Sequence, residues 1–180
     1  MIQVQLLLGE RLKLRALEPQ DVETLYKWEN DTAIWVASHT QVPFSRFILE
    51  QYIAQSHLDL HTNKQLRLMI TTKEGQDVGA IDLFDFDPQH QRAGIGILVA
   101  EKQDRGKGYA TEAVKRLLGF AFHDLKLHRV EAGCDVDNLA SARVLEKAGL
   151  QREGRKRKVL PIRGDWKDNF IYGILEEDFL

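Results

Sequence analysis

A glycine-rich turn between an apolar strand and a long helix is the segment of this chain best suited to binding a ligand. Gly106 and Gly108 allow a tight turn and let a ligand approach the main chain without interference from a Cβ atom. The helical pattern that begins at residue 108 leaves free N–H groups in its first turn, and Arg105 and Lys107 add positive charge. The segment therefore predicts an anion site that suits phosphates.

Two common phosphate motifs do not fit this turn. The pattern G-x-x-x-x-G-K-[ST] of a P-loop is absent, and Thr111 stands where a dinucleotide fingerprint needs its third glycine. The pattern Gln103-x-x-Gly106-x-Gly108 instead resembles the acetyl-CoA signature of the GNAT N-acetyltransferase superfamily.

Two further segments resemble the same superfamily. Residues 138–150 (NLASARVLEKAGL) resemble its second motif, and residues 14–21 (LRALEPQD) resemble its first strand and helix. The resemblance covers about residues 10–176, and it is closest in look to the branches that acetylate ribosomal-protein alanine N-termini and spermidine.

The resemblance implies acetyl-CoA as co-substrate. In this family the pyrophosphate lies on the N–H groups of the glycine loop, and the strand before it pairs with the pantetheine arm. Asn138 matches a position that contacts the cofactor from the following helix, and it also fits a plain helix N-cap. The residues carried over to acetyl-CoA binding are Ile97, Leu98, Val99, Gln103, Arg105, Gly106, Lys107, Gly108, Tyr109 and Asn138.

The implied reaction transfers acetyl from acetyl-CoA to a primary amine by direct attack through a tetrahedral intermediate. Many relatives use a tyrosine as the acid for the departing thiolate, but Leu145 occupies that position here. In the ribosomal-protein branch a serine and a glutamate that resemble Ser141 and Glu153 take the acid and base roles. Ser141 also fits a solvated helix residue and Glu153 a surface charge. The missing tyrosine keeps open a CoA-binding module without turnover.

The resemblance to the spermidine branch runs through residues 82–93 (DLFDFDPQHQRA), but Gly94 stands where that branch has a glutamate. Asp82 and Asp85 are candidate residues for binding a cationic amine, and they also fit acids that solvate a turn. The acceptor is therefore a polyamine-like small molecule or a protein N-terminus.

Periodicity predicts the elements that must position these residues. We expect a strand, two helices, three strands, a helix, a strand, a helix and two strands, in that order. Ser45 is the expected N-cap of the second helix, with Phe47, Ile48, Tyr52 and Ile53 as its buried stripe. The fold class is α/β (α+β), a single GNAT-like domain over residues 1–180 with a mixed, mostly antiparallel sheet and helices on both faces.

Charge and composition limit the remaining classes. Residues 1–90 carry 8 basic and 13 acidic side chains, a net charge of −5, whereas residues 91–180 carry 17 basic and 14 acidic ones, a net of +3. This division suits two ligands of opposite sign, or is surface drift. Cys134 is the only cysteine, which excludes a disulfide scaffold. The first residues (MIQVQLLLGERLK) predict no signal peptide, and no apolar stretch is long enough to span a membrane.

The remaining expectations concern partners. We expect a cytoplasmic protein without a membrane partner, and a homodimer stays open. Residues 155–158 (RKRK) favour a solvated loop over a nucleic-acid contact, because the whole chain is negative. His57 and His61 have a zinc-like spacing without a glutamate or a third ligand, so no metal is expected.

Overall fold

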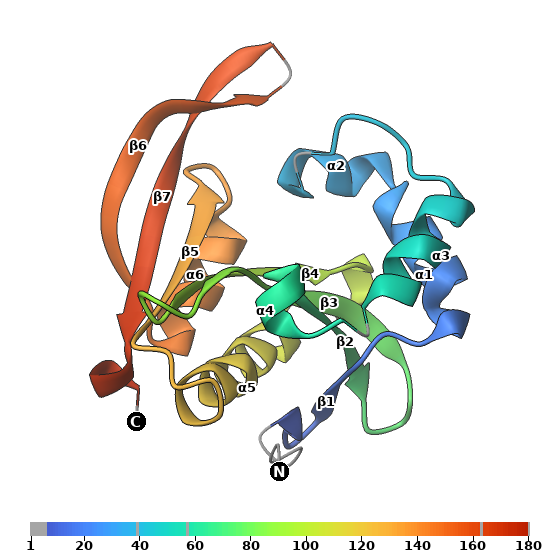
Figure 1. The fold of residues 1–180 in the computed structure, drawn as a ribbon. Coiled ribbons are helices and arrows are strands. Elements are labelled where there is room, and N and C mark those ends of the chain that lie inside the picture. Colours follow the sequence, from blue (N-terminus) through green and yellow to red (C-terminus); the bar gives the residue numbers. More distant parts are fainter. Residues whose placement is uncertain (1–6, 39, 57, 163, 180) are drawn as a thin grey trace.

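The computed structural model describes residues 7–38, 40–56, 58–162 and 164–179. The expectations for residues 1–6 and for His57 lie outside this part of the chain. The described residues form one seven-stranded sheet in the order β1-β2-β3-β4-β5-β7-β6 (Figure 1). All neighbouring strands are antiparallel except β4 and β5, which are parallel. The predicted mixed, mostly antiparallel sheet is confirmed.

The strands are Leu12–Arg15 (β1), Leu66–Thr72 (β2), Asp77–Asp87 (β3), Arg92–Val99 (β4), Arg129–Asp135 (β5), Gln151–Ile162 (β6) and Asp165–Leu175 (β7). The α-helices are Val22–Glu29 (α1), Thr32–Ser38 (α2), Arg46–Gln55 (α3), Leu60–Asn63 (α4), Tyr109–His123 (α5) and Leu139–Ala148 (α6). Short 3-10 turns lie at Pro19–Asp21 (η2), Lys102–Asp104 (η3) and Glu176–Asp178 (η4).

The sheet has a separate hydrophobic core on each face. Apolar side chains of α5 and α6 pack on one face, in a cluster that includes Leu117, Leu145 and Ile95. The helices α1 and α3 cover part of the other face, where Leu25 and Met69 belong to a smaller cluster. Strand β4 contributes to both clusters, because its successive side chains point to opposite faces.

Two sequence expectations about these elements are wrong. Among the described residues between β1 and β2 there are four α-helices, not two. On α3, Phe47 and Ile48 are 62% and 48% exposed, and the buried contacts come from Leu49 and Ile53. Ser45 does cap this helix, since its Oγ accepts a hydrogen bond from the N–H of Ile48. The capping signal is local, whereas the face that α3 buries depends on where the sheet lies.

The strands after α6 are also much longer than predicted. We expected strands at 150–153 and 169–175, but β6 and β7 form a long hairpin in which residues 155–158 are strand rather than loop. The hairpin rises beyond the other strands and faces α2 across a gap (Figure 1). The residues of β6 are mostly exposed, so this strand lacks the apolar alternation that marks a half-buried strand.

A buried ion pair joins the start of the α1 region to the sheet. The carboxylate of Asp21 is 3% exposed, and both of its oxygens lie 2.8 Å from Nη atoms of Arg15 on β1. Arg15 Nη2 also donates to Asp77 at the start of β3, at 2.8 Å. Burial raises the pKa of Asp21, but the hydrogen bonds from Arg15 and from the N–H of Glu18 outweigh it, so the pKa lies below its ordinary value.

We predict that Asp21→Asn lowers the free energy of unfolding at pH 7 by about 2 to 3 kcal/mol, because it removes one charge of a buried pair. The folded pKa is depressed, so this stabilisation is present above about pH 4 and is lost as the pH falls through the folded pKa. Urea unfolding at pH 7 and at lower pH measures both effects. The exposed pair Glu23–Arg46 provides the control: Glu23→Gln should change stability far less. An equal loss in both variants would contradict the assignment.

Candidate active site

The site begins where two parallel strands separate. The register of β4 with β5 runs only from Arg92–Arg129 to Gly94–Glu131. Beyond Gly94, β4 stays paired with β3 as far as Val99, while β5 stays paired with β7 as far as Asp135. The described residues therefore leave a wedge between the second halves of β4 and β5.

The edge of β4 that faces this wedge carries backbone hydrogen-bonding groups. The N–H of Ala100 donates to the carbonyl of Val78 on the β3 side, at 3.0 Å. Because the direction of these groups alternates in an antiparallel pair, the backbone groups of Ile97 and Val99 point the other way, into the wedge. An extended chain with amide groups can pair with this edge as an added strand.

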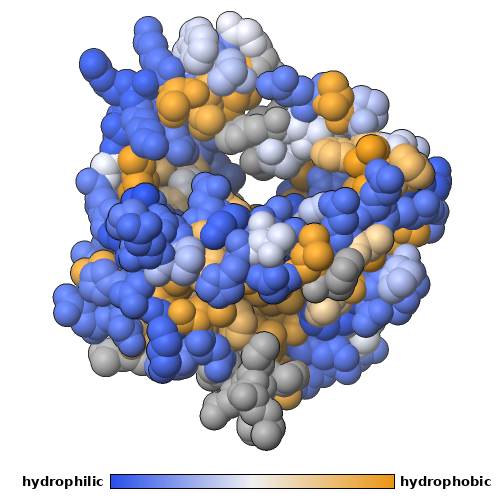
Figure 2. Space-filling model, viewed as in Figure 1, coloured by the Kyte–Doolittle hydropathy of each residue, from blue (hydrophilic) through white to orange (hydrophobic). Residues whose placement is uncertain are grey.

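A cavity of about 1390 Å³ extends from the wedge to the helices on both sides. Figure 2 shows the molecule hollowed between the β6–β7 hairpin and the α2 region. The cavity brings together most of the residues that the sequence singled out: Ile97, Leu98, Val99, Arg105, Gly106, Gly108, Tyr109, Asn138, Ser141, Asp82 and Asp85. Gln103, Lys107 and Glu153 lie outside its lining.

The glycine loop lies at one end of this cavity. Gly106 and Gly108 have φ angles of +75° and +86°, a region that other residues rarely adopt. Gly108 directly precedes α5, so the free N–H groups of the first turn of this 15-residue helix begin at the loop. A glycine loop that leads directly into a helix start has the geometry of an anion site, and binding of a phosphate there stays a prediction.

Two of the predicted basic side chains turn away from the loop to make internal contacts. Arg105 donates to the carbonyls of Val99 and Ala100, at 3.1 and 2.9 Å, and Lys107 Nζ lies 3.0 Å from the buried Asp104. Arg105 and Lys107 therefore hold the backbone of the loop in place.

Three further cations line the same cavity or contact the loop, and no motif in the sequence marks them. Arg143 and Lys147 on α6 line the cavity. Arg11, at the start of β1, donates to the carbonyl of Lys107 and lies against the ring of Tyr109. Only the fold brings these residues to the cavity or the loop.

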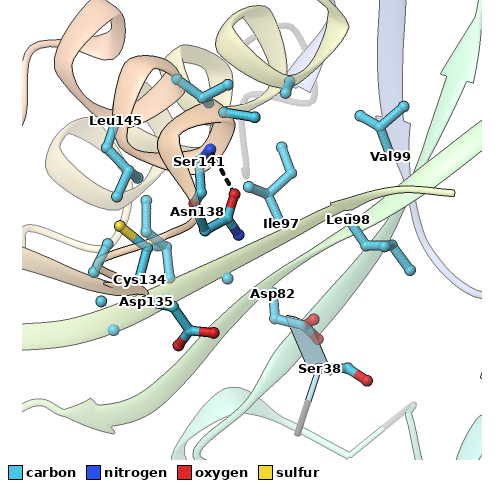
Figure 3. A pocket seen from close by; sticks show the side chains of 18 of the residues that line it. Ser38, Asp82, Ile97, Leu98, Val99, Cys134, Asp135, Asn138, Ser141 and Leu145 are labelled. Atoms are coloured by element: carbon cyan, nitrogen blue, oxygen red, sulfur yellow. Dashed lines mark hydrogen bonds between the residues drawn. The ribbon is translucent and has the colours of Figure 1, made fainter. Parts of the chain in front are cut away.

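The start of α6 places Asn138 and Ser141 on the cavity wall. The side-chain oxygen of Asn138 accepts the N–H of Ser141 at 3.1 Å, so Asn138 is the N-cap of the helix (Figure 3). Ser141 lies beside Cys134 of β5 (Figure 3). Burial raises the pKa of the Cys134 thiol, and a hydrogen bond with Ser141 opposes that shift. The carboxylate of Asp135, the next residue of β5, points toward the cavity (Figure 3).

The position at which the resemblance to the GNAT superfamily leads one to expect a tyrosine is occupied by an apolar side chain. Leu145 on α6 is 3% exposed and belongs to the core. The nearby Tyr172 of β7 is fully buried, and its hydroxyl donates to Glu146 at 3.0 Å. Burial and this hydrogen bond raise the pKa of Tyr172 to about 12. Tyr172 lies behind the cavity wall rather than in its lining.

The structure does not bring Glu153 to the site, which corrects the sequence expectation. Glu153 lies on β6, and both of its carboxylate oxygens accept hydrogen bonds from Arg129. The hydrogen bond from Arg129 lowers the pKa of Glu153, which makes the carboxylate a weaker base. Its distance along the chain from Ser141 is short, but β6 turns it away from the wedge.

The other end of the cavity contains an ion-paired cluster that the sequence did not predict as a unit. Asp82 on β3 accepts from Nε and Nη2 of Arg67 on β2, at 2.7 and 3.1 Å. Nη1 of the same guanidinium donates to Glu29 on α1 at 2.7 Å. Asp82, which the sequence predicts to bind a cationic amine, is thus ion-paired with Arg67, and its role toward an amine stays a prediction. Two carboxylates share one guanidinium, which leaves a net charge of −1 at this end.

Asp85 lies near this cluster in an unusual backbone conformation. Its φ angle is +50°, at an irregularity of the β3–β4 register between Phe84 and Asp87. Its side chain is exposed and lines the cavity. Within the described residues, no group of three or more histidine, cysteine, aspartate or glutamate side chains can hold a metal ion. In the same part of the chain, no helix is long and apolar enough to cross a membrane.

Comparisons with known proteins agree with this geometry. The family model of the acetyltransferase (GNAT) domain matches residues 11–151. The Bacillus subtilis protein "Probable N-acetyltransferase YjcK" is 35% identical over 96% of this chain and 98% of its own. Spermidine N(1)-acetyltransferase of Vibrio cholerae is 25% identical over 96% of this chain and 98% of its own. A structure of spermidine N-acetyltransferase from Vibrio cholerae in complex with CoA and spermine superposes with a TM-score of 0.86. The match covers 95% of this chain and 99% of that chain. At 24% identity, this match shows that the two proteins share a fold.

We predict that Gly108→Val weakens acetyl-CoA binding by more than tenfold, because a β-branched residue is strained at this φ angle. Its Cβ would also lie 2.9 Å from Nη2 of Arg11. Isothermal titration with acetyl-CoA measures the affinity. Gly154→Val on β6 is the matched control, since an added Cβ there meets nothing within 4 Å. Unchanged affinity in a folded Gly108→Val protein would show that the loop is misplaced.

Proposed function

This chain belongs to the GNAT acetyltransferase family, and we propose that it transfers acetyl from acetyl-CoA to the primary amine of an aliphatic, polyamine-like molecule. It is an acetyl-CoA-dependent acetyltransferase. The identity of the acceptor and the roles of the individual residues are our proposal.

The observation that carries the proposal is the pairing of two complementary features in one cavity. The unpaired edge of β4 supplies backbone partners for an extended amide chain, and the glycine loop supplies an anion site where β4 leads into α5. Acetyl-CoA combines an amide-containing arm with a pyrophosphate, so both features are needed for one ligand. Arg143 and Lys147, which also line the cavity, add positive charge that suits a polyanion.

The chemistry requires three tasks of the residues around the wedge. An ammonium cannot attack, so the acceptor must first lose a proton, which passes to solvent water. The amine nitrogen then forms a bond to the acetyl carbon, and a β4 N–H that points into the wedge stabilises the oxyanion of the tetrahedral intermediate. As the carbon–sulfur bond breaks, the thiolate needs a proton. The nitrogen of the new amide loses its extra proton in the same step. Ser141 is our candidate for passing a proton to the sulfur while taking one up again from that nitrogen through water, because it lines the cavity and its hydroxyl already hydrogen-bonds a sulfur atom, that of Cys134.

The charge at the far end of the cavity favours a cationic acceptor. The cluster of Glu29, Arg67 and Asp82 has a net charge of −1, and Asp85 adds a further carboxylate to the lining. An amine with a second positive charge gains electrostatic energy in such a site. The Vibrio cholerae relative is named for spermidine, an amine of this type.

The activity is tested by measuring release of the CoA thiol from acetyl-CoA with a panel of spermidine, an alanine N-terminal peptide and an aminoglycoside. We expect release with spermidine above the rate without an amine. Binding of acetyl-CoA without release for any amine would instead show a CoA-binding module.

We predict that Ser141→Ala lowers kcat at least tenfold and changes the KM for acetyl-CoA little, because a proton donor acts in the transition state rather than in binding. Glu153→Gln is the informative comparison, since the pair with Arg129 lies outside the cavity lining. It should leave kcat within about twofold of the parent. Equal kcat in Ser141→Ala and the parent would remove Ser141 from the mechanism, whereas a large loss in Glu153→Gln would restore Glu153 to it.

A further inference from the structure

An aromatic ring lies across two glycines in the acceptor half of the cavity. Phe84 on β3 is paired with Gly94 on β4, and Asp82 is paired with Gly96. A Cβ added to Gly94 would lie 2.4 Å from Cε2 and 2.8 Å from Cζ of Phe84, and one added to Gly96 would lie 3.5 Å from Cε1. The ring therefore occupies the space that a side chain at position 94 would fill.

The orientation of this ring gives it an open surface. One side of the ring rests on the glycine backbone, and Phe84 is 36% exposed and lines the cavity. It belongs to neither of the two buried clusters formed by the described residues. A large apolar side chain that is held in place but left uncovered contributes less to stability than a buried one, and it is free to contact a ligand.

The position of Phe84 places it with the acceptor rather than with acetyl-CoA. Side chains two residues apart on a strand share a face, so Phe84 lies on the same face as Asp82 and the Arg67 cluster. The helix α5, which follows the glycine loop, packs on the opposite face. The floor of the acceptor half thus consists of an aromatic ring beside a cluster of net negative charge.

We propose that Phe84 is a specificity-determining residue whose ring supports the methylene chain next to the reacting amine of the acceptor. The proposal rests on the proposed acetyltransferase function and adds the surface by which an unbranched alkylamine is selected. The chain lies on the ring while a second ammonium of the acceptor approaches Glu29 and Asp82. An aromatic face attracts both the methylenes and the adjacent cation.

The pairing also explains why position 94 is glycine in this chain. The spermidine-acetylating branch has a glutamate there, but any side chain at this position would displace the ring of Phe84. Phe84 and Gly94 therefore act as a unit, because the ring of Phe84 can lie over β4 only while position 94 has no side chain. An exchange at either position is expected to change the acceptor site alone.

Steady-state kinetics on the full chain test the role of the ring. With spermidine as the acceptor, Phe84→Ala should raise the acceptor KM about tenfold or more, because it removes the apolar contact. Phe84→Leu keeps the bulk of the side chain without the aromatic face, so its acceptor KM should lie between those of the parent and Phe84→Ala. The KM for acetyl-CoA should stay unchanged in both. Phe47→Ala on α3 is the matched control, since Phe47 is 62% exposed and outside the cavity lining.

Gly94→Ala provides a second test that leaves Phe84 in place. The added Cβ should displace the ring of Phe84 and raise the acceptor KM severalfold. Gly154→Ala should leave this KM unchanged, because its Cβ has no neighbouring atom within 4 Å. Thermal unfolding of each variant confirms that it is folded. An unchanged acceptor KM in folded Phe84→Ala, or a raised KM for acetyl-CoA instead, would overturn the proposal while activity persists. If the parent protein releases no CoA with any amine, the proposed function itself fails.

Discussion

The separation of β4 from β5 is the constraint on which the site depends. Both strands remain paired on their outer sides, β4 with β3 and β5 with β7. The sheet therefore loses only the hydrogen bonds between β4 and β5 where these two strands separate. Three registered pairs hold the strands together at one end, and beyond Gly94 and Glu131 their inner edges are open. A strand edge inside a domain leaves backbone groups that need partners. Here those groups line the cavity in which a ligand can satisfy them.

The same strand divides the cavity into two chemical environments. At the end of β4, the glycine loop and α5 offer N–H groups to an anion, and Arg143 and Lys147 of α6 add positive charge to the cavity lining. On the face that carries Asp82, two carboxylates share one guanidinium and leave a net negative charge. The opposite net charges of the two halves of the sequence are therefore matched by the two ends of one cavity. A polyanionic co-substrate and a cationic acceptor fit this arrangement.

The site differs from the patterns of its relatives at positions that act together. Leu145 is packed in the core where many relatives have a tyrosine, so the proton for the thiolate must come from elsewhere. Glycine at position 94 removes a carboxylate and makes room for the ring of Phe84. The ion pairs matter as much: the hydrogen bond from Arg129 lowers the pKa of Glu153 and makes this carboxylate a poorer base, and Asp82 is bound to Arg67. These side chains shift the chemistry of the acceptor half toward binding by charge and aromatic contact.

The sequence alone determined the family, the class of fold and the position of the glycine turn before α5. Those features depend on local patterns: the glycines at 106 and 108, the cap at Asn138, and periodic apolar residues that mark strands and helices. It missed the exposed face of α3 and the length of the β6–β7 hairpin, because neither follows from the periodicity of one segment. Only the tertiary structure decided which charges are free, since Arg67 reaches Asp82 and Glu29 from another strand and Arg129 reaches Glu153 across the sheet. Whether a carboxylate can bind or accept a proton depends on its neighbours in space, and the fold supplies those neighbours.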